Sequence, residues 1–220
     1  MRDSNPKVDA VVLAAGKGTR MNSDLPKVLH MVAGRALLAH VLSTVEEVGI
    51  DHTVVVVGHK AELVRETCGR PGLEFVMQEP QLGTGHAVQM AVPHLRAGGY
   101  CVVLAGDVPL LRAATLEKLI AGTVDSGAAA VVLTCIVEDA AAYGRIVKDA
   151  AGRVQKIVEA KDASPIELAI GEYNTGVFCF RTDQLIEALG SLTTDNKQGE
   201  YYLTDTVAYL VGQGRQVGAV

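Results

Sequence analysis

The sequence predicts an α/β fold, a doubly wound, mostly parallel sheet of the Rossmann-like kind with a small β-rich subregion. Over the first two-thirds of the chain, short and nearly continuous apolar runs alternate with amphipathic stretches. This alternation is typical of parallel strands that are buried on both faces and joined by helices. The last third contains two β-type runs that flank a turn-like segment at 149–152, which predicts a hairpin.

The expected elements can be placed in chain order. Continuous β-branched and other apolar residues predict strands at 8–14, 52–57, 73–77, 100–104 and 128–137. Apolar residues at helical spacing predict helices at 35–48, 60–68, 84–94 and 114–125. In the last third, a hairpin over 145–148 and 153–159 is followed by an expected strand at 176–180 and expected helices at 183–189 and 204–211.

Composition limits the class of protein. The 220 residues are 49% hydrophobic and 20% charged, which excludes a disordered tail and is enough to bury a core without a disulfide or a metal. The net charge is −5, so the chain lacks the excess of basic residues that is typical of nucleic-acid and membrane-surface binders. Apolar runs are far shorter than the ~18 residues of a membrane helix, and Asp3, Pro6 and Asp9 interrupt any signal peptide. We therefore expect a cytoplasmic protein with no nucleic-acid or membrane partner.

Cysteine and histidine spacing gives no sign of a disulfide or zinc framework. The four cysteines are widely spaced without a C-x-x-C pair, so we expect reduced and mostly buried thiols. The six histidines lack H-x-x-x-H and H-E-x-x-H spacing, so a zinc site is not expected. Because no linker, repeat or low-complexity segment interrupts the pattern, we expect a single domain over 1–220.

A glycine-rich, cationic segment follows the first expected strand. It reads LAAGKGTRM over 13–21 and ends at Pro26 and Lys27. Backbone N–H groups around Gly16 and Gly18 can cradle phosphate oxygens, and three cations can supply charge, namely Lys17, Arg20 and Lys27. The pattern is neither a Walker A loop nor the dinucleotide G-x-G-x-x-G. The alternative is a glycine-rich surface turn with solvated cations.

The string A-A-G-x-G-T-R-M followed by P-K resembles the signature of the sugar-nucleotide pyrophosphorylases. The longer strings LPKVLH at 25–30 and AGR at 33–35 resemble the uridyltransferase half of the bacterial bifunctional N-acetylglucosamine-1-phosphate uridyltransferase/glucosamine-1-phosphate acetyltransferases. The later motifs follow in the family's order across essentially the whole chain: QLGTGHA (81–87), GDVPL (106–110), YGRI (143–146), IVE (157–159), NTG (174–176) and QGEYYLTD (198–205).

This resemblance implies a nucleotidyltransferase fold and a defined reaction. Uridylyl would pass from UTP to N-acetylglucosamine 1-phosphate, giving UDP-N-acetylglucosamine and pyrophosphate for cell-wall precursor synthesis, with Mg²⁺ as cofactor. The nucleotide-binding part would span about 1–137 and the sugar-binding part about 138–220. Two alternatives remain: a sister nucleotidyltransferase of other base or sugar specificity, and a UDP-sugar-binding module with weak activity.

The expected catalytic cations are Arg20 and Lys17 at the β- and γ-phosphates, and Lys27 at the α-phosphate or the incoming sugar phosphate. Asp107 follows a buried strand, where a carboxylate can hold Mg²⁺ beside a triphosphate. The alternative for Asp107 is an Asx-turn residue. Ala105 stands where the family usually has Tyr, so we expect a lost contact without lost catalysis.

The resemblance also implies two sets of substrate contacts. The nucleotide set is Leu13, Ala14, Ala15, Gly16, Lys27, Gln78, Gly83, Thr84, Ala105, Gly106 and Asp107. The amino-sugar set is Gly144, Glu159 and Asn174. From the residues alone, Thr84 can equally be a helix N-cap and Glu159 a solvated strand-end charge. The segment 200–202 is expected to pack in support of the sugar pocket.

The resemblance further implies a second Mg²⁺-ligating Asn and a β-helix acetyltransferase half that builds a trimer. Neither lies within the 220 residues. We therefore expect a monomer for the chain taken alone.

Overall fold

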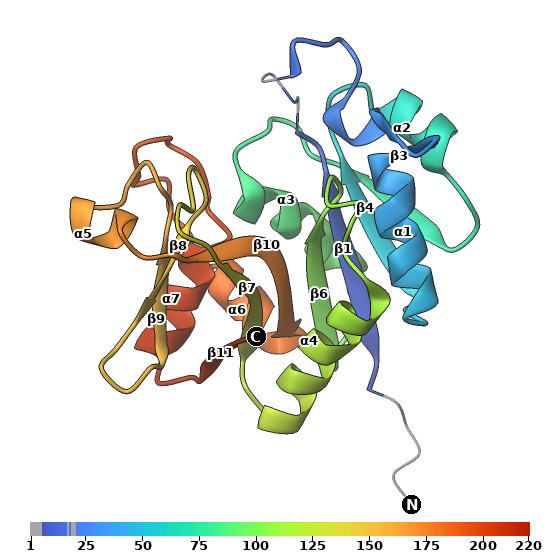
Figure 1. Ribbon diagram of the computed structural model, residues 1–220. Helices are drawn as coiled ribbons and strands as arrows, with labels where there is room; N and C mark the ends of the chain where they lie inside the picture. The colour runs from blue at the N-terminus through green and yellow to red at the C-terminus, as the bar shows by residue number, and fades with distance from the viewer. Residues whose placement is uncertain (1–5, 17, 19–20) are drawn as a thin grey trace, which may run out of the picture.

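A seven-strand path, in the order β11-β7-β10-β6-β1-β4-β5, runs through the centre of the molecule (Figure 1). The computed structural model describes residues 6–16, 18 and 21–220. In this path only β10 is antiparallel to its neighbours, so the expected doubly wound, mostly parallel sheet is confirmed. The strands of the path are β1 (Val8–Ala14), β4 (His52–Val57), β5 (Leu73–Met77), β6 (Tyr100–Ala105), β7 (Ala130–Ile136), β10 (Glu172–Arg181) and β11 (Val217–Ala219).

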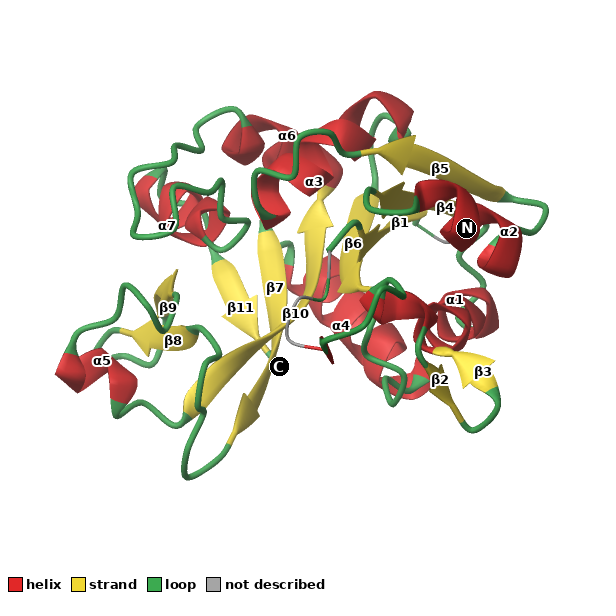
Figure 2. Ribbon diagram, turned by 90° about the horizontal axis from the view of Figure 1, so that it is seen from above, coloured by secondary structure: helices red, strands yellow, loops and turns green. Residues whose placement is uncertain are grey.

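Helices cover both faces of the sheet, as Figure 2 shows from above. One face carries α1 (Leu37–Glu47), α2 (Ala61–Cys68) and α4 (Ala113–Ser126). The other carries α3 (Thr84–Ala91), α6 (Thr182–Leu189) and α7 (Asp205–Gly212). Because side chains alternate along a strand, Val12 of β1 enters the first core and its neighbour Val11 the second. Burial on both faces is the reason why these strands are continuously apolar.

The β-rich subregion is a hairpin of β8 (Arg145–Lys148) and β9 (Val154–Val158), followed by α5 (Pro165–Leu168). Figure 1 shows it on the left of the molecule, where β8 also pairs with the start of β10. The Asp149 carboxylate accepts hydrogen bonds from the Ala151 and Arg153 N–H groups, and Gly152 adopts a φ of +78°. The expected hairpin is thereby confirmed, with a turn that Asp and Gly favour.

Several element boundaries differ from the expected ones. The helix expected from residue 35 begins at Leu37, because β3 (Arg35–Ala36) pairs with β2 (Met31–Val32) in a small hairpin. The helix expected to reach residue 94 ends at Ala91 and continues as a 3-10 turn that contains Pro93. Neither α5 nor β11 was expected, since elements of three or four residues are too short to show a periodicity.

The strand register determines where a site can form. Ala14 of β1 lies opposite Val57 of β4, and Leu13 lies opposite Ala105 of β6, so the carboxyl ends of these strands share one edge. The antiparallel β10 pairs Phe178 with Val103. The residues before Phe178 therefore extend past the end of β6, toward the same edge.

Two further expectations concern thiols and membrane segments. All four cysteines are free; Cys68, Cys101 and Cys179 are buried and Cys135 is exposed, as expected for reduced and mostly buried thiols. Within residues 6–16, 18 and 21–220, no helix has the length and apolar character that crossing a bilayer requires.

Candidate active site

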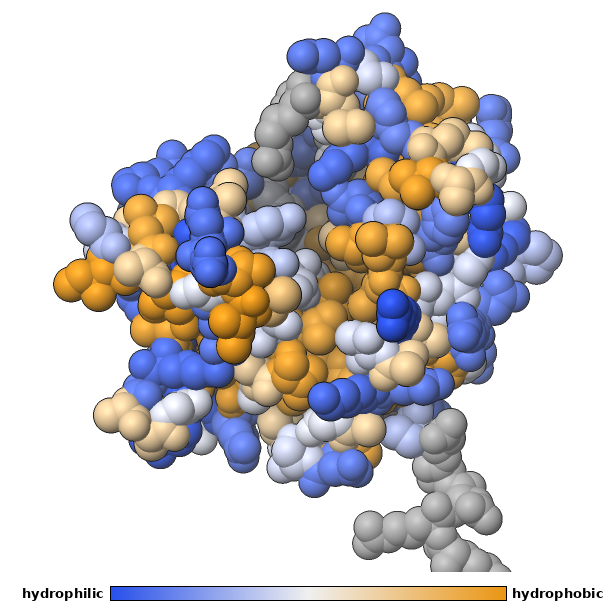
Figure 3. All heavy atoms as spheres, in the orientation of Figure 1, coloured by the Kyte–Doolittle hydropathy of each residue, from blue (hydrophilic) through white to orange (hydrophobic). Residues whose placement is uncertain are grey.

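A cavity of about 1190 Å³ lies at the carboxyl edge of the sheet. The loops after β1, β4, β5 and β6 form its walls, which is where doubly wound sheets bind ligands. Figure 3 shows this side of the molecule hollowed between the hairpin subregion and the part that carries α1 and α2. Expected site residues that line the cavity are Leu13, Ala15, Gly16, Lys27, Gln78, Gly83, Thr84, Ala105 and Asp107. Lys17 and Arg20 lie outside the described residues.

The two described glycines of the first loop have different roles. A methyl group on Gly16 would meet no described atom within 4 Å, so the bare backbone of Gly16 borders open space in the cavity. Gly18 adopts a φ of +64°, and a methyl group there would lie 2.7 Å from Cβ of Lys27. Gly18 thus lets the loop approach Lys27, whereas Gly16 leaves room for a ligand.

An ion pair joins the loop to the end of β6. The Nζ atom of Lys27 contacts Oδ2 of Asp107, and the two side chains are 40% and 23% exposed. Lys27 begins a 3-10 turn whose next residues, Val28 and Leu29, are buried and anchor it to the core. A cation that can bind phosphate and a carboxylate that can bind a metal therefore lie together on the cavity wall.

The surroundings of Asp107 fit a Mg²⁺ ion held by one protein carboxylate. Among the described residues, no group of three or more His, Cys, Asp or Glu side chains is arranged to hold a metal ion. Mg²⁺ suits a single carboxylate, because it keeps several waters and takes further ligands from substrate phosphates. No backbone N–H of the described chain donates to the Asp107 carboxylate, so the Asx-turn alternative is not supported.

Two glutamines shape the opposite wall. The buried Gln78 amide nitrogen donates to the Gly83 carbonyl at 2.9 Å and lies 3.2 Å from Nδ1 of His86. The amide nitrogen of Gln78 is therefore engaged within the protein, which leaves its amide oxygen as the group that can accept a hydrogen bond from a ligand. Gln81, which the sequence prediction missed as a site residue, lines the cavity and donates to the Ala15 carbonyl at 2.7 Å. Gln81 opens the QLGTGHA motif, and this was the signal in the sequence that could have placed it at the site.

The interpretation of Thr84 as the N-cap of a helix is wrong. Gly83 is the N-cap of α3, with a φ of +110°, and Thr84 is the first helical residue. The Thr84 hydroxyl instead accepts a hydrogen bond from the Leu203 N–H at 3.1 Å. A methyl group on Gly83 would lie 2.6 Å from the Tyr201 carbonyl oxygen. The glycine is therefore required because another part of the chain packs directly against it.

The segment that packs against Gly83 is 200–204. The sequence prediction gave 200–202 a packing role at the sugar pocket but no place beside this cavity. Glu200 lines the cavity beside Gly83. Tyr201 donates its N–H to the Leu82 carbonyl at 2.8 Å and accepts from the Gly85 N–H at 2.7 Å. Tyr202 does pack as expected, since its ring is buried and its hydroxyl donates to Asp162. Gly58 and His59 also line the cavity and were not expected there.

The expected sugar residues form a cluster of their own, outside the lining of the cavity. The Asn174 N–H donates to the Gly144 carbonyl at 2.8 Å, and a methyl group on Gly144 would lie 3.4 Å from Oε1 of Glu159. Burial raises the pKa of Glu159, and the hydrogen bond from Thr204 partly opposes that rise. The interpretation of Glu159 as a solvated strand-end charge therefore does not describe its surroundings.

Two expected contacts lie behind the cavity wall. Ala14 is buried in the core on the α1 face, so its side chain does not face the cavity. The Gly106 N–H donates to the Leu13 carbonyl at 2.9 Å and thereby fixes the end of β6 against β1. Only backbone atoms of these two residues are available to a ligand.

Comparison with known proteins identifies relatives that are about 50% identical to this chain. Two relatives are each named "Bifunctional protein GlmU". That of Cellvibrio japonicus (strain Ueda107) is 50% identical over 94% of this chain and 45% of its own length. That of Lactococcus lactis subsp. lactis (strain IL1403) is 51% identical over 96% of this chain and 46% of its own length. The chain thus spans about half the length of these curated relatives.

Solved structures share the fold at low sequence identity. A UDP-glucose pyrophosphorylase complexed with UDP-glucose has a TM-score of 0.79 at 17% identity, covering 96% of this chain and 89% of the other. HddC from Yersinia pseudotuberculosis, complexed with GMP-PN, has a TM-score of 0.68 at 20% identity and the same coverage. Residues 10–202 match the family model described as the MobA-like NTP transferase domain. With its cavity at the carboxyl edge of the sheet, the chain belongs to the MobA-like NTP transferase domain family.

Proposed function

We propose that this chain transfers uridylyl from UTP to N-acetylglucosamine 1-phosphate, releasing pyrophosphate and UDP-N-acetylglucosamine. The observation that carries the proposal is the division of one cavity into two unlike walls. One wall has the open backbone of Gly16 and the Lys27–Asp107 pair, which suit phosphates. The other has the Gln78 amide and the loop at 83–84, which suit a base and ribose.

The relatives and the sequence motifs favour this base and this sugar. The chain is 50% and 51% identical to the two GlmU proteins over most of its length. The motifs that resemble the uridyltransferase half are present in order. We assign nucleotide binding to about 1–137 and sugar binding to about 138–220. Gly144, Glu159 and Asn174 belong to the second part, and their carboxylate and amide groups suit the hydroxyl and amide groups of an N-acetyl sugar.

The reaction requires two polyanions to meet. A phosphate oxygen of the sugar 1-phosphate would attack the α-phosphorus of UTP in line, and the bond to pyrophosphate would break. The attacking oxygen is already largely anionic at neutral pH, so the chain's task is to position and neutralise charge. Lys27 would bind the α-phosphate or the incoming phosphate, and Lys17 and Arg20 the β- and γ-phosphates.

Asp107 would hold Mg²⁺, the cofactor that we propose. When bound, the ion neutralises charge on the phosphate oxygens. Asp107 would have to release Lys27 in order to hold the ion, and Lys27 would then be free to bind phosphate.

The test is Mg²⁺-dependent release of pyrophosphate from UTP and N-acetylglucosamine 1-phosphate, with the same assay repeated for CTP, dTTP and GTP and for other sugar 1-phosphates. We expect the highest kcat/KM for the first pair. A preference for another pair would replace the proposed specificity by that of a sister nucleotidyltransferase. Tight binding of UDP-N-acetylglucosamine in calorimetry without any pyrophosphate release would instead indicate a binding module.

A further inference from the structure

The hydroxyl of Thr204 points at a carboxylate instead of at its own helix. Thr204 is the N-cap residue of α7, where a threonine oxygen ordinarily accepts a hydrogen bond from the first turn. Residues 204–212 all lie in the described part of the chain, and the Thr204 side chain makes no such bond there. Its Oγ1 instead donates to Oε1 of Glu159 at 3.0 Å. Thr204 is only 4% exposed, so the hydroxyl is largely withdrawn from water. Thr204 has helical backbone angles, with φ −60° and ψ −25°, so its hydroxyl is not placed to cap the first turn and binds Glu159 instead.

The other groups around Glu159 do not favour a fixed, ionised carboxylate. Gly144, just before the neighbouring strand β8, leaves space beside Glu159. Arg145, the first residue of β8, donates its guanidinium N–H groups to the carbonyls of Ala141 and Tyr143. Within the described part of the chain, the titratable groups that act on Glu159 are acids, namely Asp162, Glu200, Asp205 and the Tyr202 phenol. Burial and these acids raise the pKa of Glu159, and the Thr204 donor lowers it.

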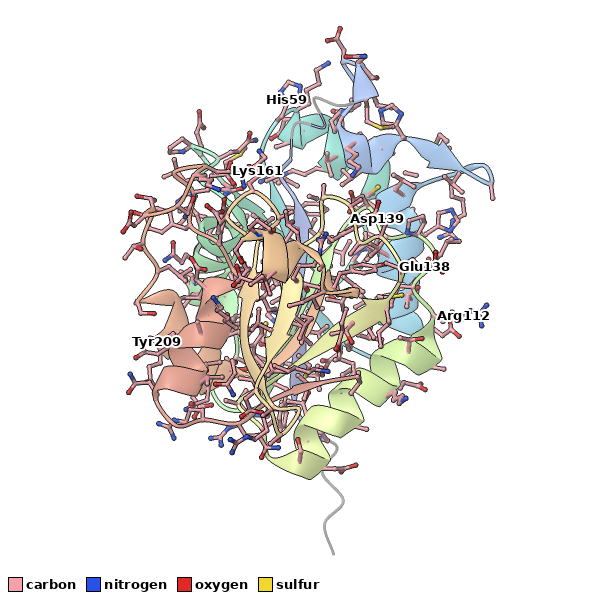
Figure 4. The ribbon with its side chains drawn as sticks, turned by 60° about the vertical axis from the view of Figure 1, so that its left-hand side comes forward. His59, Arg112, Glu138, Asp139, Lys161 and Tyr209 are labelled. Atoms are coloured by element: carbon pink, nitrogen blue, oxygen red, sulfur yellow. The ribbon has the colours of Figure 1, made fainter. Side chains whose placement is uncertain are left out.

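The backbone that carries Thr204 is held from two directions. On the nucleotide side, the adjacent Leu203 N–H donates to the Thr84 hydroxyl at 3.1 Å. On the side of Glu159, the loop after β9 holds the same segment, because Asp162 accepts from the Tyr202 hydroxyl at 3.2 Å and Lys161 donates to Gln198 at 2.5 Å. Figure 4 shows Lys161 at the upper end of the molecule, the end at which His59 of the cavity wall also lies. The position of the hydroxyl is therefore set by both sites.

We propose that Thr204 is a positioning residue, which holds Oε1 of Glu159 by a hydrogen bond so that Oε2 can accept one from a hydroxyl or amide group of the sugar 1-phosphate. The inference rests on the proposed function and adds the residue that determines sugar affinity. Thr204 itself need not touch the sugar. Supporting residues of this kind matter because a site loses affinity when its contacting side chain is free to rotate away.

Three substitutions test the role of Thr204. In Thr204→Val we expect the KM for N-acetylglucosamine 1-phosphate to rise roughly 10-fold, as for loss of a hydrogen bond to a charged group, with the KM for UTP unchanged. Thr204→Ser keeps the hydroxyl and should restore the sugar KM. Thr206→Val is the matched control, because Thr206 is buried nearby but donates to the Leu203 carbonyl, not to Glu159.

The pH profile separates positioning from a merely structural role. Without the Thr204 donor the pKa of Glu159 should rise further, so the acid limb of kcat/KM for the sugar phosphate should move to higher pH in Thr204→Val. Thr206→Val should leave that limb in place.

The outcomes distinguish this inference from the proposed function. If the wild type releases pyrophosphate from the pair but Thr204→Val keeps its sugar KM, the inference is wrong and the proposed function stands. Equal increases in both KM values, with the acid limb unmoved, would also overturn it. If the wild type releases no pyrophosphate, calorimetry decides: Thr204→Val should weaken binding of UDP-N-acetylglucosamine but not of UTP, and equal affinities for UDP-N-acetylglucosamine in both proteins would refute it.

Discussion

The ammonium group of Lys27 lies against the carboxylate of Asp107, so the cation of the first loop and the acid that ends β6 neutralise each other. Both side chains remain partly exposed to the cavity, where such a pair contributes little to stability. On the proposed function, the two charges stay paired until phosphate binds Lys27 and a metal ion binds Asp107. Predictions about each partner follow from this pairing.

Asp107→Asn should separate nucleotide binding from catalysis. Without the carboxylate we expect Mg²⁺-dependent turnover to fall on the order of 10²-fold or more. Binding of UTP in the presence of EDTA should be at least as tight as in the wild type, because Lys27 no longer has an anionic partner. Calorimetry measures the second effect, and Asp125→Asn, an exposed acid on α4, is the control. Weaker metal-free binding in Asp107→Asn would show that the pair does not restrain Lys27.

Lys27→Met should lower turnover by a similar factor, on the order of 10²-fold, because a cation on the reacting phosphates is lost. Thermal unfolding should change little, since the ion pair is partly exposed. Initial rates of pyrophosphate release measure the first quantity. The same substitution at Lys118, an exposed residue of α4, should leave both unaltered. Normal turnover in Lys27→Met would remove Lys27 from the proposed phosphate contacts.

The two glycines of the first loop should respond differently to alanine. Gly16→Ala should retain the wild-type stability but weaken nucleotide binding, because its methyl group would point into open cavity space. Gly18→Ala should lower the free energy of unfolding by about 1 kcal/mol or more, since its φ is positive and the methyl group would collide with Lys27. Urea denaturation and UTP titration of both variants measure the two effects. A destabilised Gly16→Ala would mean that the loop packs more tightly than the structure shows.

Glu159→Gln should gain stability at neutral pH. The pKa of Glu159 is raised in the folded state, mainly by burial, so the folded protein binds a proton more readily than the unfolded chain. Stability therefore decreases as pH rises above the ordinary glutamate range, and a neutral amide avoids that loss. The advantage of the variant over the wild type in urea denaturation should shrink as pH is lowered from 7.5 toward 5. Glu117→Gln, on the exposed face of α4, should show no such trend.

The sequence could predict those features whose causes are local. Val11 and Val12 point into different cores, so β1 appears in the sequence as a continuous apolar run. Asp149 and Gly152 form their turn within a few residues, and the turn is visible in the sequence for that reason. The carboxylate at Asp107 could be placed at the ligand edge because it directly follows such a strand.

Contacts between distant segments could not be predicted in this way. The partner of the Thr84 hydroxyl is Leu203, which is 119 residues away, and the local pattern favoured a helix cap that α3 does not use. The positions of Gln81 and Glu200 in the cavity wall were missed for the same reason, because loops that are far apart in sequence meet there. The clustering of Gly144, Glu159 and Asn174 likewise depends on how β8, β9 and β10 assemble.

The packing of Gly83 and Gly85 against Tyr201 also bears on how the site forms while the chain is being synthesised. While the ribosome has released only the portion through β7, Gly83 and Gly85 lack their contacts with Tyr201, and the Thr84 hydroxyl lacks the Leu203 N–H. Gly16, Gly18 and Asp107 have already been synthesised by then, but the segment 200–204, which packs against Gly83, has not. On the proposed function, a nascent chain at that stage would carry its phosphate contacts before its base and ribose contacts are complete, so selectivity for the nucleotide would arise late in translation.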